Sequence, residues 1–146
     1  MRVDDVNTRI LVELWNVGDV KRRAVVAQLE KCAPCTLKQF LVMDVIAQSH
    51  VNVVPSALAW KLGCSKPNVT QLLAELNYSK WLTLIPTYRD LRSSIVQLSE
   101  SGFATYASYG RQLAKIADEE LAPLDEETRR AFAMVLRALA GFRTRL

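Results

Sequence analysis

The hydrophobic positions of this chain recur with two different periods, and the change of period marks its elements. Apolar residues spaced three and four apart predict helices over residues 3–30, 36–48, 54–63, 65–76, 99–117 and 125–139. Trp81–Ile85 and Ser94–Leu98 are instead rich in β-branched and apolar residues, which is typical of paired strands. Val53-Val54 is expected to add a short strand to this pair. The pattern predicts a mainly α-helical chain with one β-ribbon.

Two of the predicted helices follow one another with a tight turn between them. Gly63 closes the first helix, at a position where left-handed backbone is needed. Ser65 is the expected N-cap of the second helix, and Pro67 lies in its first turn, where a missing N–H is harmless. This arrangement is a helix-turn-helix, whose second helix enters the DNA major groove. The apolar face of that second helix is formed by Val69, Leu72, Leu73 and Leu76.

The other faces of the second helix carry side chains that donate to phosphates and base edges. Asn68 and Gln71 can pair bidentately with adenine, and Lys66 can reach guanine or a phosphate. The alternative is an ordinary solvated helix face. The predicted DNA-binding residues of this segment are Ser65, Lys66, Pro67, Asn68, Thr70 and Gln71.

A charged hairpin tip, Pro86–Arg92, lies between the two predicted strands. A tip that carries two arginines beside a helix-turn-helix resembles the wing of a winged helix. The order and spacing of these parts resemble the MarR family of bacterial transcription regulators, over about residues 36–142. The matching segments are Thr36–Phe40, Ala57–Gly63, Asn68–Thr70 with Leu76, Asp90–Arg92 and Val96–Gly102.

The resemblance assigns roles to the residues of the wing. It implies that Arg92 enters the minor groove and that Asp90 helps to hold the tip in shape, with Arg89 beside them. A narrow A·T-rich minor groove attracts arginine electrostatically, which gives the assignment a physical basis. The alternative is a hairpin tip held together by salt bridges.

The terminal helices predict a homodimer. Residues 1–35 are interpreted as an N-terminal dimerisation helix with a connecting turn, 36–102 as the winged helix-turn-helix, and 103–146 as C-terminal dimerisation helices, all within one integrated domain. The first helix and the last two are too apolar for a monomer whose winged domain is already complete, and in MarR-like proteins these helices pair two copies. Trp15, Trp60 and Trp81 could line a cavity for a small aromatic effector or belong to the core.

Charge is concentrated in the segment that is predicted to bind DNA. The formal net charge of the 146-residue chain is +4, and five basic and two acidic residues between Lys61 and Arg92 supply +3 of it. Such a concentration is typical of a phosphate-binding face. No apolar run approaches the roughly 20 residues that span a bilayer, so we expect a cytoplasmic protein without a membrane partner.

Three cysteines and one histidine favour neither a disulfide scaffold nor a zinc site. Cys32-Ala33-Pro34-Cys35 precedes a predicted helix, and a helix N-terminus stabilises a thiolate, so Cys32 and Cys35 are a candidate redox pair. The alternatives are a metal site and two small residues in a turn. No nucleophile motif, paired-carboxylate signature or glycine-rich phosphate loop is found. We therefore predict no enzyme, no cofactor and no metal.

These observations predict a repressor that binds double-stranded DNA at a pseudo-palindromic operator as a homodimer. Release is expected through a small ligand or through oxidation. The alternative is a protein-interaction module that has the same fold and little DNA affinity.

Overall fold

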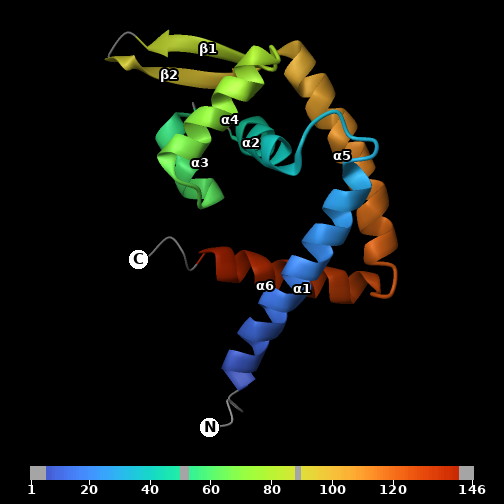
Figure 1. The fold of residues 1–146 in the computed structure, drawn as a ribbon. Helices are drawn as coiled ribbons and strands as arrows, with labels where there is room; N and C mark the ends of the chain where they lie inside the picture. The colour runs from blue at the N-terminus through green and yellow to red at the C-terminus, as the bar shows by residue number, and fades with distance from the viewer. Residues whose placement is uncertain (1–5, 50–52, 88–89, 142–146) are drawn as a thin grey trace. The chain divides into compact units, whose positions relative to one another are not determined.

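The computed structural model describes residues 6–49, 53–87 and 90–141, and for residues 87–94 it describes at most the backbone. It confirms a mainly helical winged helix-turn-helix fold with a two-stranded wing (Figure 1). The chain forms two compact units, Met1–Gln112 and Leu113–Leu146. The elements are α1 (Val6–Leu29), α2 (Leu37–Gln48), α3 (Pro55–Leu62), α4 (Lys66–Tyr78), β1 (Leu82–Thr87), β2 (Asp90–Leu98), α5 (Glu100–Glu120) and α6 (Glu126–Gly141).

The core of the first unit is built around α2, which buries Phe40, Val42, Met43 and Ile46. Val42 and Met43 of α2 have no exposed surface, and they cluster with Leu58 of α3 and Leu76 of α4, which are also fully buried. Leu82, Val96 and Leu98 of the ribbon close the same cluster. The core therefore holds the helix-turn-helix and the base of the wing together.

The wing is longer than the sequence pattern predicts. Its two strands pair antiparallel from Leu82 opposite Leu98 to Thr87 opposite Asp90, with an irregular register between Pro86 and Thr87. The prediction of a tip over residues 86–92 is therefore wrong, because most of that segment is strand. Proline is tolerated there because a two-stranded ribbon has free edges and does not need every N–H. The expected strand at residues 53–54 is a single bridge between Val53 and Val96.

A network of serine hydroxyls fixes the start of α5 against the end of α4. The Ser99 hydroxyl accepts from the Gly102 N–H at 3.0 Å and donates to the Lys80 carbonyl at 2.7 Å. The Ser101 hydroxyl donates to the same carbonyl at 2.9 Å. Gly102 packs so closely that an added Cβ would lie 2.1 Å from the Trp81 carbonyl oxygen. These contacts explain the Ser-x-x-Gly spacing after β2.

The second unit ends in the amphipathic helix α6. Asp125 caps it: its Oδ1 accepts from the Thr128 N–H at 2.7 Å, and this hydrogen bond lowers the pKa of Asp125. Arg130 and Glu126 form an ion pair one turn apart. No described residue of α6 is buried, and its exposed large apolar side chains are Phe132, Met134, Val135, Leu136 and Leu139. Within the described parts of the chain, no helix has the length and hydropathy to cross a membrane.

Candidate functional site

The turn between α3 and α4 has the geometry that the sequence predicts. Gly63 adopts left-handed backbone with φ 62° and ψ 29°, and the Cys64 N–H donates to the Ala59 carbonyl at 3.0 Å. Ser65 is the N-cap of α4: its hydroxyl accepts from the Asn68 N–H at 3.4 Å. The two helices are therefore joined by a three-residue turn, as in a helix-turn-helix.

The polar side of α4 that is predicted to contact DNA, called here the reading face, is exposed. The predicted apolar side of the same helix is buried or half-buried. Val69 and Leu76 are buried, and Leu72 and Leu73 are half-buried against the core. The fold thus holds one side of the helix in the domain and leaves the other side open to a partner. All six predicted DNA-binding residues of this segment are exposed: Ser65, Lys66, Pro67, Asn68, Thr70 and Gln71.

Besides the capping Ser65, two of the exposed side chains, Thr70 and Gln71, make hydrogen bonds on the protein. The Thr70 hydroxyl donates to the Lys66 carbonyl at 3.0 Å, so its oxygen lone pairs remain available. The Gln71 amide nitrogen donates to Glu75 at 3.2 Å, and Glu75 also accepts from Gln39 of α2 at 3.2 Å. Sequence reasoning missed both partners. The four-residue spacing could have indicated Glu75, whereas Gln39 meets α4 only in the folded chain.

The predicted DNA contacts of the wing stay predictions. Asp90 and Arg92 belong to β2, with Asp90 opposite Thr87 in the register, but their side chains lie outside the described residues. Arg89 lies outside the described residues altogether.

A pocket of about 220 Å³ lies between the C-terminal half of α1, the start of α2 and the middle of α5, all within the first unit. Val26, Leu29 and Leu37 provide apolar walls. Arg22 and Lys38 bring two positive charges to the lining, and Glu30 brings one negative charge. Arg22 also forms an exposed ion pair with Asp19 at 3.3 Å. The remaining lining residues are Cys35, Thr36 and Tyr109.

Tyr109 contributes an unusual group to this pocket. Its side chain is 1% exposed, and its hydroxyl finds no hydrogen-bond partner among the residues that the structure describes. The ring stacks on Phe40 with centroids 4.4 Å apart, which holds it in place. Burial raises the pKa of Tyr109 to about 12. The hydroxyl is therefore a neutral donor at physiological pH.

Replacing Tyr109 with phenylalanine is expected to raise the free energy of unfolding by about 1 kcal/mol, because a buried hydroxyl without a partner costs about 1–3 kcal/mol. Tyr106→Phe is the matched control. The Tyr106 hydroxyl donates to Asp44 at 2.8 Å, and its ring stacks on the same Phe40. The control should lose about 1 kcal/mol. Urea denaturation measures both, and a destabilised Tyr109→Phe variant would contradict the prediction.

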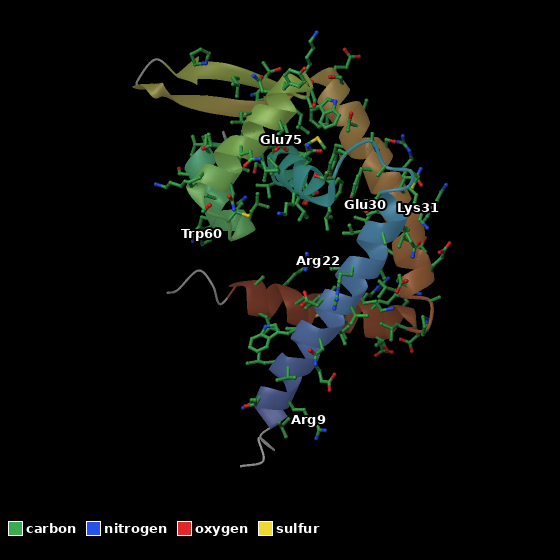
Figure 2. All side chains as sticks on the ribbon, in the orientation of Figure 1. Arg9, Arg22, Glu30, Lys31, Trp60 and Glu75 are labelled. Carbon is green, nitrogen blue, oxygen red and sulfur yellow. The ribbon has the colours of Figure 1, made fainter. Side chains whose placement is uncertain are left out.

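None of the three tryptophans lines this pocket, and the expectation that they line a ligand cavity stays a prediction. Trp15 and Trp60 are 65% and 62% exposed, and Trp81 is half-buried against the core (Figure 2 labels Trp60). Trp60 lies two residues from the buried Leu58, which turns it to the opposite side of α3.

The environment of Cys35 opposes the thiolate that its position in the sequence suggests. Partial burial raises the pKa of Cys35 to about 11. The N–H groups of Thr36 and Gln39 are bonded to each other's side chains within a capping box, so neither is free to stabilise a thiolate. Cys32 is exposed, and both thiols are free. Among the described residues, no group of three or more His, Cys, Asp or Glu side chains could hold a metal.

Limited alkylation with iodoacetamide at pH 7.5 is expected to modify Cys32 well before Cys35. Cys32 is exposed, whereas less than about 0.1% of a thiol with the raised pKa of Cys35 is ionised at this pH. The reactivity of Cys35 should rise steeply only as the pH approaches its pKa. Peptide mass spectrometry locates the label, and equal rates at the two sites would restore the redox hypothesis.

Similarity to known proteins is found by comparing structures and not by comparing sequences. No protein-family model matches the sequence, and no curated protein matches it significantly. A transcriptional regulator of the MarR family from Rhodococcus sp. RHA1 superposes with a TM-score of 0.82 at 14% identity, covering 94% of this chain and 96% of that one. BldR from Sulfolobus solfataricus gives 0.80 at 14% identity, with full coverage of both chains.

A third similar structure was solved with a ligand. PcaV from Streptomyces coelicolor, in complex with its natural ligand, gives a TM-score of 0.74 at 17% identity and covers 97% of this chain and 98% of that one. Together these likenesses and the site geometry define a winged helix-turn-helix protein. More narrowly, the fold is that of the MarR-type transcriptional regulators, and the predicted resemblance is confirmed at the level of fold.

Proposed function

We propose that this protein is a DNA-binding transcription regulator of MarR type that represses by occupying a pseudo-palindromic operator as a homodimer. The observation that carries the proposal is the exposed polar face of α4, which follows a three-residue turn and lies beside a two-stranded wing. In such a fold the second helix of the pair enters the major groove, and the hairpin reaches the neighbouring backbone or minor groove.

A second copy of the chain is the proposed partner of the terminal helices, within residues 1–35 and 103–146. On α1, large apolar side chains remain exposed in the single chain, with Val6, Trp15 and Val20 at 70%, 65% and 58%. On α6, Met134 and Val135 are 68% and 55% exposed. So many large apolar side chains exposed on two amphipathic helices favour an interaction site. A two-fold dimer would place the two α4 helices about 34–36 Å apart, in successive major grooves.

The pocket between α1, α2 and α5 supports release by a small aromatic acid. Its apolar walls suit an aromatic ring, and Arg22 and Lys38 suit a carboxylate. The similar PcaV structure contains that protein's natural ligand. Release by oxidation of Cys32 and Cys35 is the weaker proposal, because the raised pKa of Cys35 keeps its thiol protonated.

Selection of bound sequences from random duplex DNA tests the proposal. The expected result is an inverted repeat whose half-sites are centred 10–10.5 base pairs apart, bound with an affinity that falls steeply with salt. An inverted repeat also tests the dimer, because a symmetric site requires a symmetric protein. Failure to enrich any sequence, with a flat salt dependence of binding, would favour the protein-interaction module.

A further inference from the structure

A chain of three hydrogen bonds joins the N-terminal cap of α2 to the reading face of α4. The Thr36 N–H donates to Oε1 of Gln39 at 3.0 Å. Nε2 of Gln39 donates to Oε2 of Glu75 at 3.2 Å, and Nε2 of Gln71 donates to Oε1 of Glu75 at 3.2 Å. Figure 2 labels Glu75 on α4, close to α2. The carboxylate is thus held between an amide of its own helix and an amide of a neighbouring helix.

The donor and acceptor of each of these three hydrogen bonds are fixed by groups that can only donate or only accept. A backbone N–H can only donate, so it fixes Oε1 of Gln39 toward Thr36 and leaves Nε2 of Gln39 to face α4. An ionised carboxylate can only accept, so Glu75 takes hydrogens from both amides. Gln71 must then turn its nitrogen toward Glu75, and Oε1 of Gln71 takes no part in these three hydrogen bonds.

We propose that Glu75 is a positioning residue that makes Gln71 read the major groove with its carbonyl oxygen. Bases with an amino group on the major-groove edge, adenine and cytosine, can donate to that oxygen, whereas guanine and thymine present acceptors. Adenine is favoured further, since the remaining amide hydrogen of Gln71 can donate to its N7. The inference rests on the proposed function, because it specifies how α4 reads an operator.

The Glu75→Gln variant distinguishes a positioning role of Glu75 from a role in charge or stability, because only a positioning role predicts a changed base preference. The new side chain is nearly isosteric, but it carries one acceptor and one donor. Gln39 is still oriented by Thr36 and donates to the new Oε1, so the new Nε2 is left to donate to Oε1 of Gln71. Gln71 would then present its nitrogen to the groove. The preference at that base should invert, from adenine or cytosine to guanine or thymine on the contacted strand.

The experiment measures competition binding of the full-length protein to the selected operator and its single-base variants. Gln71→Ala locates the base, because it should lose a preference of about fivefold or more at one position of each half-site and leave the others intact. Glu75→Gln should invert the preference at that same position. Gln39→Ala combined with Glu75→Gln should abolish the inversion, because the new amide is then free to turn either way.

Glu100→Gln is the matched control, since it removes one negative charge from the first turn of α5, outside this chain of hydrogen bonds. It should leave every base preference unchanged. A Glu75→Gln variant that keeps the wild-type preference would overturn the positioning role and leave the proposed function standing. A Gln71→Ala variant that loses affinity equally on all sequences would overturn it as well. Wild-type protein that selects no sequence would overturn the proposed function and this inference together.

Discussion

Replacing Gly102 with alanine is expected to destabilise the protein by about 3 kcal/mol, the upper end of the usual cost of overpacking. An added Cβ would lie 2.1 Å from the carbonyl oxygen of Trp81 and 2.9 Å from its carbonyl carbon. These are backbone atoms and cannot rotate away as a side chain would. Relief requires the start of α5 to move from Lys80 and Trp81, which would break the hydrogen bonds of Ser99 and Ser101.

Urea denaturation of the wild type and the variant measures this effect as a shift of the midpoint. Gly110→Ala is the matched control: Gly110 lies in the same helix, and an added Cβ there would meet nothing within 4 Å. Alanine at that position should stabilise by about 0.5–1 kcal/mol through helix propensity. If both variants shift the midpoint alike, close packing at Gly102 does not explain the glycine after β2.

Replacing Arg92 with alanine is expected to weaken operator binding and to lower its salt dependence. Each phosphate charge that an arginine neutralises, from the minor groove or by direct contact, contributes about 0.9 to the slope of log affinity against log salt, so two wings of a dimer would lose roughly 2. The affinity difference between the variant and the wild type should narrow by about tenfold between 50 and 200 mM salt. Fluorescence anisotropy across that range on the selected operator provides the measurement.

Arg9→Ala controls for the loss of charge, because Arg9 is exposed on α1 and belongs to neither α4 nor the wing. It should leave the slope unchanged. An Arg92→Ala variant with the wild-type slope and affinity would remove Arg92 from the DNA-binding surface, while the assignment of α4 would still stand on the operator selection.

The elements that short-range physics controls could be predicted from the sequence. The left-handed backbone at Gly63 and the cap at Ser65 are predicted and observed. The caps at Thr36 and Asp125 are equally local, since each depends on groups within four residues of one another. The buried side of α4 follows from its own hydrophobic spacing in the same way. Since the fold class rests on the order of such local signals, it too could be predicted from the sequence.

Side-chain environments that arise between elements could not be predicted in this way. The sequence places Cys35 next to a helix start, but the pKa of its thiol follows from burial, which depends on neighbouring elements. Trp15 and Trp60 look like core residues by type, yet they are exposed because other positions of α1 and α3 face the domain. The pocket around Tyr109 combines residues from three helices, which no local pattern relates.

The reading face of α4 also has features that the sequence determines and features that depend on the tertiary structure. The sequence by itself determined that α4 exists, where it begins, and that Lys66, Asn68 and Gln71 lie on its polar side, because helical periodicity and capping are local. Only the tertiary structure decided what Gln71 can present to a partner. Its amide is turned by Glu75, and Glu75 is also held by Gln39, whose contact with α4 spans 36 residues of sequence. Hydrogen-bond direction is a property of the assembled network, so the sequence pattern could not supply it.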